Sequence, residues 1–129
     1  MKVGDIVKMY APVAGYKKYH FCVCLPEDEV AGRFLFLNSD PSYRDCLSID
    51  CARIPDIPAS DTGVTAISFS LLPRYNQAKL NVYQAEVVGT MPADVVAEML
   101  EFLDGVRSLP KGDKECVREA LEFLNEQNA

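Results

Sequence analysis

Apolar and polar positions along the 129-residue chain follow one pattern before Gly89 and another after it. Before Gly89, short apolar or alternating runs are separated by clusters of Gly, Pro, Asp and Asn, which is typical of strands joined by turns. After Gly89, apolar residues recur at the three- and four-residue spacing of amphipathic helices. Strands followed by a helix pair predict an α+β domain, with a strongly bent antiparallel sheet or small barrel capped by helices.

The pattern predicts five or six strands, at residues 4–10, 18–25, 33–38, 46–51, 64–72 and 80–88. Alternation along 18–25 divides that strand into two faces. One face carries Tyr19, Phe21, Val23 and Leu25, and the other carries Lys18, His20, Cys22 and Cys24. The run at 33–38 is apolar on both faces and therefore predicts a central strand that is covered on both sides.

Two helices are expected at the end of the chain. The first begins near Thr90-Met91-Pro92 and extends to residue 106, since proline is well tolerated at a helix start. The second begins with Asp113 as its N-cap and exposes an acidic face. We therefore expect one domain over 1–129, with the barrel at 1–89 and a helical cap at 91–126.

Composition and charge narrow the function classes. Apolar residues make up 49% and charged residues 25%, which excludes a disordered or low-complexity chain. The net charge is −6, and this argues against sequence-independent binding of nucleic acid over the whole surface. The first 24 residues differ, with four lysines against one aspartate, so this segment alone could present a basic patch.

The number of cysteines and the N-terminal sequence predict the cellular compartment of the protein. The number of cysteines is odd, and no secretion signal or membrane span is visible, so we expect reduced thiols in the cytoplasm. His20, Cys22 and Cys24 lie on one predicted strand face, but a zinc site needs a second ligand pair that the sequence lacks. A half-buried strand face is the favoured interpretation, and no metal or cofactor is expected.

The sequence has no P-loop, dinucleotide fingerprint, G-x-S-x-G or H-E-x-x-H motif. Three polar clusters remain, at 16–20, 38–45 and 74–76. Metal-independent cleavage of a phosphodiester needs a base, an acid and a cation. If the loops converge, these groups could come from His20, Lys17 or Lys18, Ser39, Arg44 and Arg74. The alternative interpretation of these clusters is structural. His20 in the first cluster would be a structural histidine on a strand, and the second cluster would form an Asx-type turn.

The order of these features resembles the MazF/PemK-like toxins of toxin–antitoxin systems over roughly residues 3–106. The resemblance rests on Val3-Gly4-Asp5-Ile6-Val7, a lysine-rich loop before an apolar strand, the run from Phe34 to Ser39, and Val87-Val88-Gly89-Thr90-Met91-Pro92. It implies an SH3-like barrel, a homodimer and cleavage of single-stranded RNA, with inhibition by an antitoxin protein. Lys18-Tyr19-His20 stands where the family usually has Arg-Pro.

The RNA-cleavage hypothesis assigns roles to individual residues. His20, Ser39 and Arg44 would be catalytic, with His20 as base or acid. The substrate would be held by Lys17, Lys18, Tyr19, Arg74 and Tyr75. The alternative function is a non-catalytic barrel module of a phage or plasmid, which binds a protein partner through its acidic helices and through Tyr16, Tyr19, Tyr43 and Tyr75.

Overall fold

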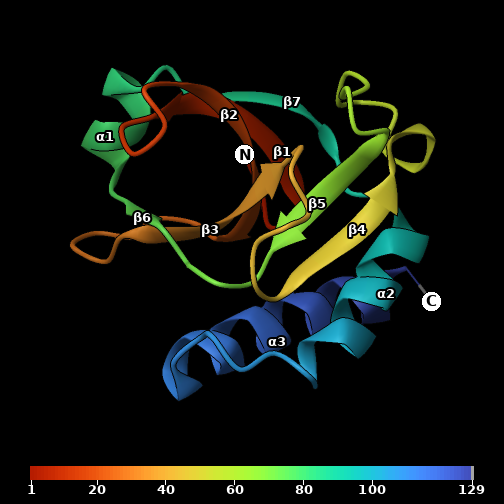
Figure 1. The fold of residues 1–129 in the computed structure, drawn as a ribbon. Helices are drawn as coiled ribbons and strands as arrows, with labels where there is room; N and C mark the ends of the chain where they lie inside the picture. The colour runs from red at the N-terminus through yellow and green to blue at the C-terminus, as the bar shows by residue number, and fades with distance from the viewer. Residues whose placement is uncertain (129) are drawn as a thin grey trace.

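The computed structural model describes residues 1–128 (Figure 1). In chain order the elements are β1 (Asp5–Ala11), β2 (Tyr16–Cys24), β3 (Gly32–Asn38), β4 (Cys46–Asp50), the 3-10 helix η1 (Cys51–Arg53), β5 (Val64–Ser68), β6 (Arg74–Tyr75), α1 (Gln77–Val82), β7 (Glu86–Thr90), α2 (Ala93–Leu103) and α3 (Lys111–Gln127). The α+β prediction is confirmed. Within the described residues, no helix has the length and apolar character needed to cross a membrane.

All strands belong to one antiparallel sheet with the order β4-β5-β3-β2-β1-β7. β3 also pairs with β6 near its start, while its end pairs with β5. Figure 1 shows a strongly curved sheet with α2 and α3 together at one side and α1 next to β6. β3 is therefore the central strand, as its doubly apolar sequence predicted.

The expected closed barrel is not formed by strand pairing. β4 and β7 are the two ends of the hydrogen-bonded path, and the sheet remains open between them. The segment after η1 lies against β7 instead: a Cβ placed on Gly89 would lie only 2.5 Å from Cβ of Asp56. A loop packed on the edge strand thus covers the side that a closed barrel would pair.

Both faces of the sheet carry a core, because side chains alternate along each strand. The main core joins one face to α2 and α3, through residues that include Phe21, Leu35, Val95 and Leu121. The second core lies on the opposite face beneath β6 and α1, and consists of Val7, Met9, Cys22, Phe34, Tyr75 and Leu80. The helical cap therefore shares one continuous core with the sheet.

The prediction of a strand at 80–88 is wrong over its first half. Helix α1 occupies residues 77–82, and strand β7 begins only at Glu86. The Asn76 side chain caps the helix by accepting a hydrogen bond from the Lys79 backbone N–H at 2.8 Å. Leu80 then anchors α1 in the second core, a tertiary contact that the local pattern does not reveal.

The assignment of Asp113 as an N-cap is also wrong. Helix α3 begins at Lys111, directly after Pro110, and Asp113 lies inside its first turn. An acid in this position interacts favourably with the helix dipole. Its carboxylate also receives a hydrogen bond from Arg74 of β6 at 2.6 Å, which ties α3 to the sheet.

Candidate functional site

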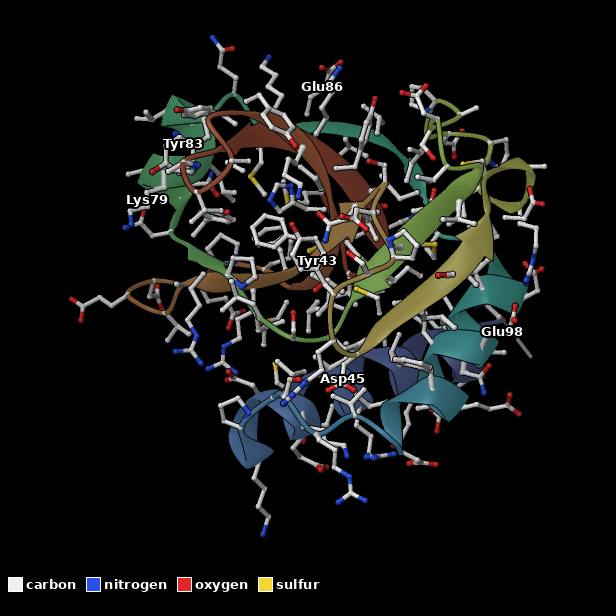
Figure 2. The ribbon with its side chains drawn as sticks, viewed as in Figure 1. Tyr43, Asp45, Lys79, Tyr83, Glu86 and Glu98 are labelled. Carbon is white, nitrogen blue, oxygen red and sulfur yellow. The ribbon has the colours of Figure 1, made fainter. Side chains whose placement is uncertain are left out.

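A pocket of about 320 Å³ lies where the start of β2, the end of β3 and two loops meet. Its floor is partly apolar, because Tyr19, Leu37 and Ile57 also pack against the main core. Figure 2 shows Tyr43 on the loop between β3 and β4, near the centre of the view. The lining residues are Tyr16, Lys17, Lys18, Tyr19, Leu37, Asn38, Ser39, Asp40, Tyr43, Ile57, Pro58, Ala59, Ser60, Val64 and Thr65.

Two adjacent lysines of β2 supply the positive charge of this pocket. The Lys18 ammonium donates a hydrogen bond to Oδ1 of Asn38 and lies 4.9 Å from the centroid of the Phe36 ring. Burial lowers the pKa of Lys18, since desolvation disfavours the charged form. Neither Lys17 nor Lys18 forms an ion pair with any residue that the structure describes. The pocket therefore presents cations that lack a carboxylate partner.

Hydrogen bonds join the two loops that form the rest of the wall. The Thr62 hydroxyl donates to the backbone oxygen of Ser39 at 2.6 Å, and the Ser60 hydroxyl donates to the backbone oxygen of Val64 at 2.8 Å. Asp40 accepts from the backbone N–H of Ser42 at 2.9 Å. Hydrogen bonds from the hydroxyl and N–H of Ser42 lower the pKa of Asp40. The contact from Thr62 therefore ties Ser39 to the loop between η1 and β5.

Three tyrosines give the pocket its aromatic character. Tyr16 and Tyr43 are 62% and 60% exposed. Tyr19 is half-buried, and the Lys8 ammonium lies 5.5 Å from its ring centroid. A flat ligand at the mouth of the pocket could therefore stack on two exposed rings.

His20 lies outside this pocket and is completely buried. Its ring packs among Phe34, Phe36 and Tyr75, with the Phe36 centroid 4.9 Å away. Nδ1 lies 3.1 Å from the Lys18 backbone oxygen, and Nε2 has no hydrogen-bond partner in the described residues. Burial lowers the pKa of His20 to about 4. The expected role as catalytic base or acid has no support, because substrate cannot reach the ring.

Some of the other predicted site residues line the pocket, and the rest lie elsewhere in the fold. Lys17, Lys18, Tyr19 and Ser39 line the pocket, whereas the convergence hypothesis also required His20, Arg44 and Arg74 there. Arg44 is exposed on the β3–β4 loop but does not line the pocket. Neither β6 residue lines it, since Arg74 pairs with Asp113 and Tyr75 is buried in the second core.

The wall formed by residues 57–60 and Thr65 was not predicted from the sequence. Close to this wall, the Cys51 sulfur accepts a hydrogen bond from the Ser60 backbone N–H at 3.5 Å. That contact and the Ser60 hydroxyl lower the pKa of Cys51. The only sequence signal was a long loop rich in Pro, Ser and Asp, and loops of this kind often carry binding residues. Nothing in its spacing placed it beside β2.

The side chains of the pocket can bind an anion together with a flat ring. In the described part of the chain, no three His, Cys, Asp or Glu side chains lie close enough together to hold a metal ion. Comparisons of this chain with protein-family models, with curated proteins and with solved structures found no match.

Proposed function

We propose that the pocket binds single-stranded RNA, the ligand class that the resemblance to MazF/PemK-like toxins implies. One observation carries this proposal: Lys17 and Lys18, without ion-pair partners, converge with exposed tyrosines and Ser39 on one pocket. Single-stranded nucleic acid is commonly bound by the combination of a cationic surface and aromatic rings.

The lysines act on the phosphate backbone. An anionic phosphate at Lys18 offsets the cost of holding a partly desolvated ammonium, which is the cost that lowers the pKa of Lys18. Lys17 directly precedes Lys18 on β2 and lines the same pocket, so it can contact the same or a neighbouring phosphate. The chain as a whole is acidic, with a net charge of −6, and this confines binding to a short stretch of RNA.

The tyrosines act on the bases. Stacking of a base on an aromatic side chain contributes about 1–3 kcal/mol, and Tyr16 and Tyr43 leave more than half of their surface free for it. The amide of Asn38 and the hydroxyl of Ser39 can hydrogen-bond base edges or the 2′-hydroxyl. A duplex hides the faces of its bases, so these rings favour single strands.

The proposal concerns binding rather than cleavage. Proton transfer during cleavage needs a group within hydrogen-bond reach of the reacting atoms. His20, the only histidine of the chain, is fully buried on the other side of β2. The geometry therefore supports the binding part of the MazF/PemK-like function, and it gives no support to histidine-dependent catalysis.

Replacing both pocket lysines should weaken RNA binding by about tenfold or more, because two phosphate contacts are lost. The salt dependence should also become shallower, with the slope of log K against log salt reduced by about 1.4 for two contacts to a single strand. Fluorescence anisotropy with a short labelled RNA, measured for the parent and for Lys17→Ala/Lys18→Ala across a salt series, checks both effects.

The matched control is Lys79→Ala/Lys111→Ala, which removes two exposed lysines that lie on α1 and α3, outside the pocket. This control has the same net charge as the test variant, so it should bind RNA nearly as well as the parent. Equal losses in both variants, or no binding of single-stranded RNA by the parent at low salt, would contradict the proposal. A pocket that takes a protein partner would then explain the exposed tyrosines.

A further inference from the structure

One edge of the sheet has no strand paired along it and no loop packed on it as at the other edge. Within residues 1–128, β4 pairs with β5 alone and ends the hydrogen-bonded path. The opposite end of the path differs, because the segment around Asp56 packs on β7 at Gly89. Figure 1 shows β4 as the outermost strand, with α2 beside it. The sheet can therefore accept a further strand at β4.

The register shows which backbone groups of β4 point outward. Just before the strand, the N–H of Phe69 donates to the backbone oxygen of Asp45 at 2.9 Å. Hydrogen-bonded pairs alternate along an antiparallel ladder, so the odd-numbered residues of β4 bond to β5. The N–H and C=O groups of Cys46, Ser48 and Asp50 then point away from β5, and they have no backbone partner within the described residues. Such a row of free groups is a template for pairing with another chain.

A groove of about 300 Å³ lies beside this edge, between β4 and α2. Leu47 and Phe102 form its apolar part. The Phe102 ring is held in place by Phe69, with the two ring centroids 5.3 Å apart. Side chains that lie opposite each other on neighbouring strands share one face of the sheet. A strand added to β4 would therefore send every second side chain into the groove, next to Leu47.

The charge of the groove determines which ligand suits it. Glu98 (Figure 2) and Glu101 of α2 complete its lining. Arg53 pairs with Glu98 and with Asp94, whereas Glu101 is exposed and has no ion-pair partner in the described part of the chain. Pairing of β4 with β4 of a second copy would bring two sets of these carboxylates together, and like charges across an interface disfavour it. The groove instead favours a cationic ligand.

We propose that the edge of β4 binds an extended basic peptide of another protein as an added antiparallel strand. Main-chain hydrogen bonds to Ser48 and its neighbours supply affinity, and the groove selects the side chains. An apolar side chain packs on Leu47 and Phe102, and a lysine or arginine two residues along the peptide lies beside Glu101. This site shares no lining residue with the proposed RNA pocket, so it does not rest on RNA binding.

The test uses the full chain and a fluorescein-labelled heptapeptide, Thr-Val-Thr-Lys-Thr-Lys-Thr, whose valine and lysines occupy the positions that face the groove. Fluorescence anisotropy at low salt should show saturable binding of this peptide. Two control peptides should bind about tenfold more weakly or worse. One carries glutamates in place of the lysines, and the other is methylated on the backbone nitrogens of its threonines, which removes the hydrogen bonds to β4.

Two substitutions in the protein test the same two features. Glu101→Lys should weaken binding of the lysine peptide by about fivefold or more, because an attraction becomes a repulsion. Ser48→Pro should abolish binding, since proline removes an outward N–H without removing a bond to β5. The matched control is Glu122→Lys, which makes the same charge change at an exposed site on α3 and should bind the peptide nearly as well as the parent.

No binding of the lysine peptide by the parent would overturn the proposal. Equal losses in Glu101→Lys and Glu122→Lys would overturn it too, since they would indicate attraction to the acidic surface as a whole. A dimer of the parent that Ser48→Pro abolishes would show that a second copy occupies the edge instead. Circular dichroism checks the fold of Ser48→Pro. If this variant does not fold, equal binding of the methylated and unmethylated peptides by the parent would contradict strand addition.

Discussion

Acidification from pH 7 to pH 4 should lower the free energy of unfolding by about 3 kcal/mol through His20 alone. The His20 ring is fully buried among aromatic side chains, and burial lowers its pKa in the folded protein to about 4. In the unfolded chain the pKa of a histidine is about 6.5. Between these two values the unfolded state binds a proton that the folded state does not. Stability is therefore present above about pH 6.5 and falls as the pH decreases toward 4.

The control for this effect is His20→Phe, which keeps an aromatic ring in the second core and removes the titratable group. Urea unfolding of both proteins at several pH values separates His20 from the carboxylates, because the carboxylates contribute equally to both curves. The difference in unfolding free energy between parent and variant should change by about 3 kcal/mol over this window. A constant difference from pH 7 to pH 4 would show that His20 titrates alike in both states.

Gly32→Ala should destabilise the fold by about 2 kcal/mol or more, because overpacking forces the backbone to move. A Cβ on Gly32 would lie 2.8 Å from Cδ of Pro26 and 2.9 Å from the backbone oxygen of Cys24. These atoms belong to backbone or to a rigid ring, so no flexible side chain can yield. Gly32 also starts β3, the strand that pairs with β2, β5 and β6.

Gly112→Ala is the matched control, since a Cβ there meets no atom within 4 Å. Gly112 lies in the first turn of α3, where alanine is the better helix former by about 0.5–1 kcal/mol. Urea unfolding should therefore show opposite signs for the two substitutions. A Gly32→Ala variant as stable as the parent would mean that the turn between β2 and β3 is less tightly packed than the structure shows.

The parts of the fold that local pattern determines were predictable. The doubly apolar run at 33–38 is the central strand β3, and the helical spacing after Gly89 corresponds to α2 and α3. Helix α1 was not predictable, because Leu80 and Val82 alternate with polar residues as in a strand. The Asn76 cap and the burial of Leu80 in the second core stabilise a helix at these residues instead of a strand.

Only part of the candidate site could be predicted, because the rest also depends on contacts between segments that are distant in the sequence. Lys17, Lys18 and Tyr19 come near Ser39 because β2 and β3 are neighbours in the sheet, with Tyr19 opposite Leu37 in the register. The sequence placed His20 on the face opposite Tyr19 correctly, but it could not show that β6 and α1 cover that face. Whether a strand histidine is buried or exposed depends on the elements that pack over it, and those elements come from distant parts of the sequence.

Photo-crosslinking of single-stranded RNA that carries 4-thiouridine tests the proposed site most directly, because it reports which residues touch the bases. Crosslinks should map to Tyr16, Tyr19 or Tyr43 by mass spectrometry. Tyr83, which lies beside α1 and apart from Tyr43 (Figure 2), and Tyr10, whose ring packs against Tyr83, serve as the internal comparison. Crosslinks that map to Tyr10 or Tyr83 and spare the pocket tyrosines would contradict the assignment of this pocket as the RNA-binding site.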